Sequence, residues 1–253
     1  SDEAIYYRNE EKIFTSGNSR ALNEKNIITA SNFEYDKIQN IIKAQNNVEI
    51  IDIEKDSKIY SDEAIYYRNE EKIFTSGKTK ALIEKKYEIN SQDVTYLRSS
   101  SKLSSQKKSS LKDDDKNFYQ LDSFEYIIND KLLKGKNVKV LSNGGVNKTD
   151  EYFFSEGFFD FKKESFISKK TNIKVHKNIF ENENQDPRLY GASSQGNAEK
   201  TIINKGVFTS CKISDKCTPW SISSDKITHD KIKKDIIYND ALLKIYDVPV
   251  MYF

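Results

Sequence analysis

The chain has 253 residues, of which 32% are charged and 36% hydrophobic, and its 41 Lys and Arg against 39 Asp and Glu give a formal net charge of +2. Interspersed charges of both signs argue against a nucleic-acid-binding surface, and 15 Tyr and 14 Phe argue against disorder. The sequence contains no apolar run of about 18 residues that would form a membrane-spanning helix. Because residue 1 lies in the middle of a repeat, we expect the chain to be a fragment of a longer protein.

The stretch SDEAIYYRNEEKIFTSG occurs twice without a change, at residues 1–17 and 61–77. Such self-similarity indicates a duplication within a repeat architecture. A shorter period lies inside it, since an apolar residue followed two positions later by an aromatic one recurs at spacings of 29 to 35 residues. The pairs are Ala4/Tyr6, Phe33/Tyr35, Ala64/Tyr66, Val94/Tyr96, Phe124/Tyr126 and Phe159/Phe161.

Residues 26–54 alternate between apolar and polar side chains, as Phe33, Glu34 and Tyr35 illustrate. A period of two is typical of a strand with one buried and one solvent-facing surface. Asn143-Gly144-Gly145 is a turn signal between two later units. Further strands of the same kind are expected at residues 56–97, 118–141, 152–175, 201–213 and from Trp220 onward.

Two segments interrupt the repeats. Residues 98–117, RSSSKLSSQKKSSLKDDDKN, are of low complexity, and we expect them to form a flexible insert because so polar a segment lacks apolar residues to bury. Residues 181–200 are rich in Asn, Gln, Ser and Gly and break the pattern again. We therefore divide the chain into repeats at residues 1–180 and a C-terminal part at residues 181–253.

Short strands stacked at a fixed period, without a convincing helix, predict an all-β fold, an elongated and open β-jelly-roll or solenoid-like stack of antiparallel strands. The inward positions would form a row of apolar side chains, which suits a long apolar ligand. The other interpretation is that these side chains only pack against one another. The candidate groove residues are Phe33, Tyr35, Ala64, Tyr66, Val94, Tyr96, Phe124, Tyr126, Phe159 and Phe161.

A catalytic or metal-binding constellation is absent from the sequence. His176 and His229 are distant from each other, and no nucleophile motif accompanies them. Cys211 and Cys217 lack the further Cys or His ligands of a zinc site. We therefore expect no enzymatic activity, no metal and no cofactor.

The last third of the chain carries several short motifs in order. They are Gly206-Val207-Phe208-Thr209-Ser210-Cys211, Pro219-Trp220-Ser221-Ile222, Ile227-Thr228-His229-Asp230, Tyr238-Asn239-Asp240-Ala241 and Val248-Pro249-Val250. This run resembles the end of the periplasmic domain in the LptD (OstA/Imp) family of outer-membrane lipopolysaccharide translocons, where it leads into a transmembrane β-barrel. The earlier repeats resemble the OstA-type units of the same transport system.

The resemblance implies a β-jelly-roll on the periplasmic face of the Gram-negative outer membrane, which receives lipopolysaccharide and guides its acyl chains along an apolar interior toward the barrel. It implies three protein partners: an LptA-like periplasmic bridge that pairs with an edge strand, the C-terminal barrel, and an LptE-like plug lipoprotein. An open stack exposes such edges. Residues 1–17 are the candidate edge for the bridge.

The resemblance also bears on the two cysteines, which fit an oxidising periplasm. By analogy with the family, Cys211 or Cys217 pairs with a cysteine of the barrel. A mutual bridge between Cys211 and Cys217 and two free thiols are the alternatives.

Other functions are also compatible with a stack of strands. A soluble LptA-like bridge protein is the nearest, although it should lack the Pro-Trp and Val-Pro-Val motifs. A structural or adhesive β-solenoid is a second alternative. A carbohydrate-cleaving solenoid would need two carboxylates at a fixed separation. The recurring acids, such as Asp62-Glu63, are adjacent and would point to opposite faces of a strand.

Overall fold

The computed structural model describes residues 1–22, 26–142, 150–176, 185–214 and 218–253. These residues form twenty strands and a 3-10 turn, η1 (Arg68–Glu70), and all the strand pairs described below are antiparallel, so the all-β prediction is confirmed. The chain divides into two compact units: unit 1 comprises residues 1–114 and 122–130, and unit 2 comprises residues 115–121 and 131–253. The predicted division at residue 180 is a different one and stays a prediction.

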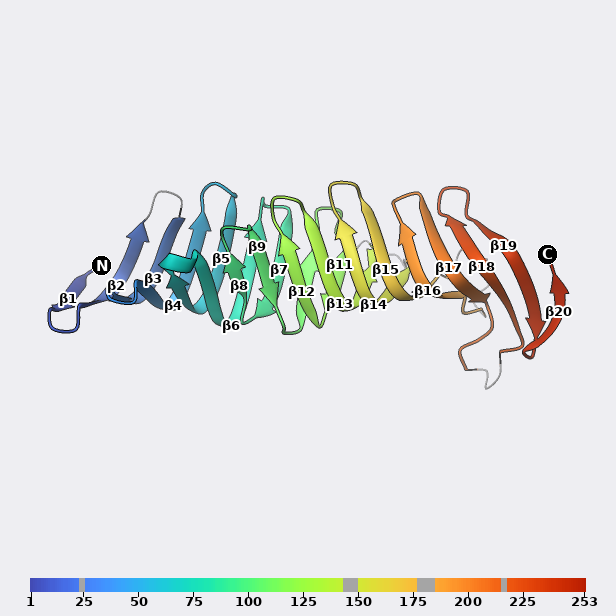
Figure 1. The fold of residues 1–253 in the computed structure, drawn as a ribbon, viewed down its shortest axis with the longest axis horizontal. Helices are drawn as coiled ribbons and strands as arrows, with labels where there is room; N and C mark the ends of the chain where they lie inside the picture. Colours follow the sequence, from blue (N-terminus) through green and yellow to red (C-terminus); the bar gives the residue numbers. More distant parts are fainter. Residues whose placement is uncertain (23–25, 143–149, 177–184, 215–217) are drawn as a thin grey trace. The chain divides into compact units, whose positions relative to one another are not determined.

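Unit 1 is a sheet whose strands β1 to β6 pair in chain order (Figure 1). Beyond β6 the sheet divides, because residues 72–74 of β6 pair with β8 while residues 78–83 pair with β7. The first branch continues through β9 to β12 and the second to β10. The strands are β1 (Glu3–Tyr7), β2 (Lys12–Leu22), β3 (Asn26–Asp36), β4 (Ile41–Asp52), β5 (Ser57–Tyr67), β6 (Lys72–Ile83), β7 (Tyr87–Gln92), β8 (Thr95–Leu97), β9 (Lys102–Ser105), β10 (Ser109–Lys112) and β12 (Ser123–Ile127).

Unit 2 is a sheet that runs from β11 to β13 and then in chain order to β20. Its strands are β11 (Phe118–Leu121), β13 (Leu132–Leu141), β14 (Glu151–Asp160), β15 (Ser165–Lys174), β16 (Arg188–Gly196), β17 (Lys200–Thr209), β18 (Trp220–Asp230), β19 (Asp235–Ile245) and β20 (Val248–Tyr252).

Several hairpin turns share one local design, in which an Asp ends the strand and the residue four positions later has a positive φ. The Asp carboxylate accepts hydrogen bonds from main-chain N–H groups two or three residues ahead, as in an Asx turn. A left-handed residue then reverses the chain. The pairs are Asp36 and Asn40 (φ 56°), Asp52 and Asp56 (φ 42°), Asp160 and Glu164 (φ 49°), and Asp230 and Lys234 (φ 60°).

The long strands bend near their middle. At the bend, the alternation of buried and exposed residues shifts by one position. In β5 the buried residues are Ser57, Ile59 and Ser61 and then Ala64 and Tyr66, with a register shift between residues 61 and 63. Such an irregularity kinks a strand and re-aims its side chains. The bend brings the two halves of each sheet face to face, and the core lies between them.

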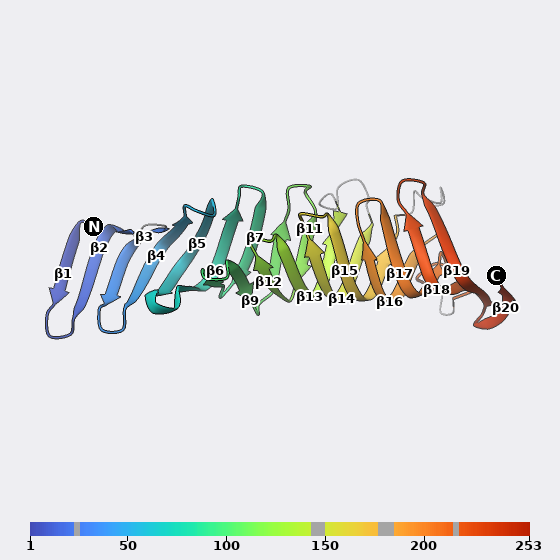
Figure 2. The same ribbon diagram turned by 45° about the horizontal axis from the view of Figure 1, so that its top comes forward.

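Contacts between strand halves show this closure in each unit. In unit 1 the hydroxyl of Tyr96 on β8 donates a 2.8 Å hydrogen bond to Asp52 at the end of β4. In unit 2 the ring of Tyr119 on β11 meets Phe159 on β14 edge to face, with 5.2 Å between centroids. Figure 2 shows the strands of each unit turned by 45° about the horizontal axis from the view of Figure 1.

The prediction of a flexible insert at residues 98–117 was wrong. This segment contains β9 and β10, and the side chains of Leu103 and Leu111 are each 1% exposed. Leu103 lies directly opposite Tyr96 on one neighbouring strand and Tyr126 on the other. In each of these short strands a single leucine among serines points inward. The low mean hydropathy of the segment therefore gives no sign of these two buried leucines.

Candidate functional site

The aromatic members of the repeat in unit 1 form one cross-strand row, in which each Tyr lies directly opposite an aliphatic residue on the next strand. Cross-strand aromatic–aliphatic pairs of this kind stabilise a sheet. We call this set the tyrosine row. From β1 to β12 it runs Tyr6, Ile13, Tyr35, Ile42, Tyr66, Ile73, Tyr96, Leu103 and Tyr126.

A second row lies two residues nearer the bend and combines two phenylalanines with smaller side chains. Phe33, Ala44 and Ala64 stand opposite one another in succession, and Ala64 is opposite Thr75. Phe124 continues the set on β12, where it faces Ser105. Val94 joins it through hydrogen bonds of its backbone with the Thr75 hydroxyl, at 3.0 and 3.1 Å.

The tyrosine row becomes progressively more exposed toward β1. Tyr126, Tyr96 and Tyr66 are 0%, 2% and 7% exposed, Tyr35 is half-buried, and Tyr6 is 50% exposed. The aliphatic members follow the same order, since Leu103 and Ile73 are buried whereas Ile42 and Ile13 are half-buried. Among the described residues, the apolar side chains of the row are therefore buried around β12 and exposed on β1.

Eight of the ten predicted groove residues lie in these two rows of unit 1, and Phe159 and Phe161 lie in unit 2. Phe159 is buried and Phe161 half-buried, and both contact the ring of Tyr119. Phe166, directly opposite Phe159, adds a further ring to this cluster. Whether any of these residues contacts a lipid stays a prediction.

Sequence reasoning missed the aliphatic half of the tyrosine row. Ile13, Ile42, Ile73 and Leu103 each follow a row Tyr by seven positions. This constant spacing is the length of the intervening hairpin, which returns the chain to the level of the aromatic residue. The spacing was available in the sequence and identifies the partner of each aromatic residue.

A small interior cavity lies beside the closed part of the row, and Asp52 places a carboxylate in its lining. Tyr96 and Asp52 meet there, and Arg98 approaches the same carboxylate at 3.9 Å. Burial, together with the Asp52 charge, raises the pKa of the Tyr96 hydroxyl well above its usual value, so this hydroxyl stays a donor. The lining residues are Ile50, Asp52, Ser57, Ile59, Ile83, Tyr96, Leu103 and Ile128.

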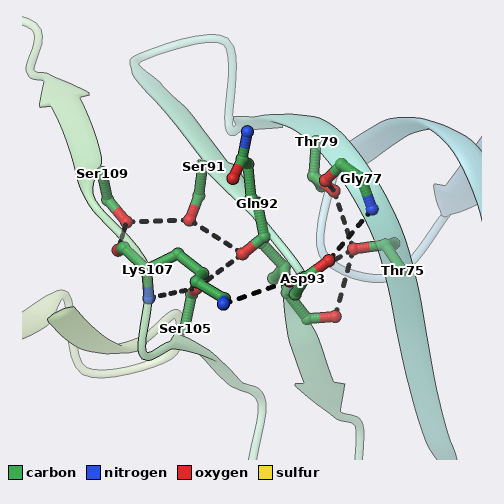
Figure 3. Close-up of polar contacts among 10 residues, drawn as sticks. Thr75, Gly77, Thr79, Ser91, Gln92, Asp93, Ser105, Lys107 and Ser109 are labelled. Carbon is green, nitrogen blue, oxygen red and sulfur yellow. Dashed lines mark hydrogen bonds and ion pairs between the residues drawn. The ribbon is translucent and has the colours of Figure 1, made fainter.

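Hydroxyl side chains line the bend of unit 1 and form a polar seam (Figure 3). Thr75 and Thr79 lie 2.7 Å apart, and Ser91 and Ser109 lie 2.8 Å apart. Gly77, whose φ is +80°, donates its N–H to the carboxylate of Asp93 at 3.0 Å. These polar groups hydrogen-bond one another within the bend. The apolar rows are therefore the part of the interior that could contact an apolar ligand.

The remaining predicted residues lie in unit 2. Cys211 is buried, with its Sγ 3.5 Å from the carbonyl oxygen of Trp220, whereas Cys217 lies outside the described residues, so the disulfide alternatives stay predictions. His229 is 2% exposed, and burial lowers its pKa. Within the described ranges no three His, Cys, Asp or Glu residues are grouped as a metal site would require. No helix in the same ranges is long and apolar enough to cross a membrane.

Comparisons with known proteins give a distant structural likeness that covers part of the chain. No family model matches the chain, and no curated protein matches it. A solved structure that is similar in part is that of LptH from Pseudomonas aeruginosa, described as the LptA homologous periplasmic component of the conserved lipopolysaccharide transport device. The likeness covers 48% of this chain and 80% of LptH, with 12% sequence identity and a TM-score of 0.38.

Proposed function

We propose that this chain is a lipopolysaccharide-transport domain in which the tyrosine row contacts the acyl chains of lipid A. The observation that carries the proposal is the graded exposure of the row, from 0% at Tyr126 to 50% at Tyr6. A continuous apolar row whose members range from fully buried to half exposed offers a surface on which a long hydrocarbon chain can lie across successive strands.

The apolar side chains of the row suit a ligand that binds without directional contacts and can therefore slide along the row. Each acyl CH₂ group that leaves water contributes about 0.8 kcal/mol, and this contribution has no preferred direction. The outward faces of the same strands carry ion pairs, such as Lys12 and Lys43 with Glu34 at 3.3 and 3.5 Å. Hydrocarbon is therefore favoured inside, and sugars and phosphates are favoured outside.

At the finer level, we propose a periplasmic domain of an LptD-like translocon at the periplasmic face of the outer membrane. The support is the order of motifs in residues 206–250, which occupy β17 to β20 and their connections. Its proposed partners are an LptA-like bridge at an edge strand, a C-terminal barrel and an LptE-like lipoprotein. No catalytic step is proposed, so energy for transport would come from elsewhere.

A purely structural role is the second candidate, and the packing around β12 favours it. Tyr126 is fully buried, and its ring lies 5.9 Å from that of Tyr87, so this end of the row is filled by its own side chains. If the stack only forms a scaffold, the partly exposed members of the row should show no preference for lipids.

Photocrosslinking distinguishes the two candidates. The photoreactive amino acid p-benzoylphenylalanine replaces Tyr35, which is inward and half-buried, or Glu34, its outward neighbour on the same strand. Cells producing each variant are irradiated, and adducts are detected with an antibody against lipopolysaccharide. We expect adducts at position 35 at least tenfold above those at position 34. Equal labelling at both positions would rule out an interior route for the lipid.

A further inference from the structure

The interior of unit 1 is bounded by two rims, one at each end of its bent strands. On β4, Ile42 lies level with Tyr96 through the tyrosine row, whereas Asp52 lies at the far end of the same strand. We call the β4–β5 turn (residues 53–56) the first rim and the β8–β9 turn (residues 98–101) the second rim. A contact between these turns therefore joins opposite ends of the strands.

Polar contacts cross from one rim to the other beside the closed part of the tyrosine row. The hydroxyl of Tyr96 donates to the carboxylate of Asp52 at 2.8 Å. The guanidinium of Arg98 lies 3.3 Å from the carboxylate of Glu54 and 3.9 Å from that of Asp52. We call these four side chains the latch, because they tie the end of β4 and the first rim to β8 and the second rim.

The chemistry of the latch favours a contact that can be broken and made again. The side chains of Asp52 and Arg98 are 4% and 12% exposed, whereas that of Glu54 is 47% exposed. A half-exposed ion pair adds little to stability, and a buried pair loses hydration that its attraction barely restores. If the rims part, water can hydrogen-bond to each of these groups. Opening the latch therefore leaves no polar group without a partner.

The interior cavity of unit 1 borders the latch. Asp52 and Tyr96 belong to its lining, together with Ile50 from the part of β4 that ends at the first rim and Leu103 from the strand that begins at the second. Parting the rims would expose this apolar lining to water, which is unfavourable unless an apolar ligand covers it. The opening of the latch is therefore coupled to the presence of hydrocarbon.

Unit 2 has the same three kinds of group across its own interior. The hydroxyl of Tyr152, near the start of β14, donates to Asp150 at 3.4 Å. Lys231 follows the end of β18 that lies opposite to the level of Tyr152, yet its Nζ is 5.7 Å from the centroid of the Tyr152 ring. A carboxylate, a tyrosine hydroxyl and a cation thus recur where opposite strand ends meet, which favours a shared role.

We propose that the latch of unit 1 is reversible, and that parting of the two rims admits hydrocarbon chains to the interior from the side, between the turns. Arg98 is its main positioning residue, because it contacts both carboxylates of the first rim and the end of β4. The inference rests on the proposed function for the class of ligand. The parting of the rims itself requires no lipid and can be measured without one.

Double electron–electron resonance measures the separation of the rims in the ligand-free chain. Ile53→Cys and Ser100→Cys, at exposed positions of the first and second rim, carry the spin labels in a chain whose native cysteines are replaced by serine. We expect Arg98→Gln to raise the population at longer distances at least threefold. Lys102→Gln is the matched control, because its 3.5 Å ion pair with Glu125 joins neighbouring strands and does not cross between the rims.

Two results of this measurement overturn the latch: an unchanged distance distribution in Arg98→Gln, or an equal change in Lys102→Gln. If Arg98→Gln does not fold, as judged by circular dichroism, Glu54→Gln replaces it, because Glu54 is half-exposed and the fold does not depend on it. Glu54→Gln should shift the distances in the same direction, and no shift in this variant overturns the latch as well.

Entry from the side is tested with the fluorescent fatty acid cis-parinaric acid, whose uptake is followed by stopped-flow fluorescence. We expect uptake at least fivefold faster in Arg98→Gln than in the parent chain. A bismaleimide with a disulfide in its linker, joining Ile53→Cys to Ser100→Cys, should slow uptake at least fivefold until the linker is reduced. Unchanged uptake in the crosslinked chain overturns entry from the side alone. Absence of uptake by every variant overturns the hydrocarbon interior of the proposed function as well, whereas the distances measured without ligand still decide whether the rims part.

Discussion

Replacing Leu103 by Ala should destabilise unit 1 by about 3 kcal/mol, although Leu103 belongs to a serine- and lysine-rich segment. The side chain is 1% exposed and stands between Tyr96 and Tyr126 on its two neighbouring strands. Leu→Ala changes in a core cost about 2–5 kcal/mol, and the cost depends on how far the site can collapse. Two fixed aromatic rings limit the collapse, and Leu103 already borders a cavity, which places the expected value near the middle of that range.

Hydrogen exchange measured by mass spectrometry is the suitable assay, because two units need not unfold as one cooperative system. Peptides from β5, β6 and β8 should lose protection in the variant, while peptides from unit 2 serve as an internal reference. Lys102→Ala is the matched control, since Lys102 lies on the outward face and its ion pair with Glu125 is 3.5 Å long and partly exposed. Exposed pairs of this kind are worth about 0.2–1 kcal/mol. Surface substitutions usually change the free energy of unfolding by less than about 0.5 kcal/mol. If Leu103→Ala costs no more than that, residues 102–105 are not packed as a strand.

Three further predictions follow from the polar and packed sites. Tyr96→Phe removes a 2.8 Å hydrogen bond to the buried carboxylate of Asp52 and should cost about 1.5–3 kcal/mol in urea unfolding followed by circular dichroism; a cost that persists unchanged in an Asp52→Ala background, which has no acceptor for this bond, would contradict the assignment. Burial lowers the folded-state pKa of His229, so as the pH falls the unfolded chain takes up a proton before the folded chain does. The stability of unit 2 should therefore fall as the pH drops below about 6.5. His229→Gln should flatten this pH dependence, and an unchanged slope would refute it. Gly206→Ala would place its Cβ 2.6 Å from Ile227 and should cost about 1–3 kcal/mol by thermal denaturation, whereas no change would mean that β17 and β18 lie farther apart there.

The architecture could be predicted from the sequence because the repeat fixes both the strand period and the hairpin length. An apolar–aromatic pair marks each inward strand end, and an aliphatic residue seven positions later marks the return of the chain, as in Tyr35 and Ile42. What periodicity did not predict is the division of the sheet at β6. There the N–H of Gly77 and the carboxylate of Asp93 form a contact across the bend, and the next strand is interrupted to form β7 and β8. That interruption depends on tertiary hydrogen bonds, which leave no periodic signal.

The flexible-insert error has a related cause. Composition averages over a segment, whereas burial is decided residue by residue at positions that face inward. Ser105 and Ser109 are buried together with the two leucines because their hydroxyls find partners, Ser105 on the carbonyl of Gln92 at 2.6 Å and Ser109 on Ser91 at 2.8 Å. Serine is therefore an interior residue in the polar seam, whereas a rule based on hydropathy would take serine as a sign of a loop.

The duplicated stretch separates what a sequence determines alone from what its neighbours determine. Both copies form a strand, a hairpin and a second strand with the same register, so Tyr6 faces Ile13 as Tyr66 faces Ile73. Exposure is not shared, since Tyr66 is covered by β4 and by the opposite half of the sheet whereas Tyr6 stands at the edge. A candidate lipid contact is thus a property of position in the stack rather than of the motif. Probes for a ligand belong at the accessible members, Tyr35 and Tyr6, because a probe at the fully buried Tyr126 would report only on packing.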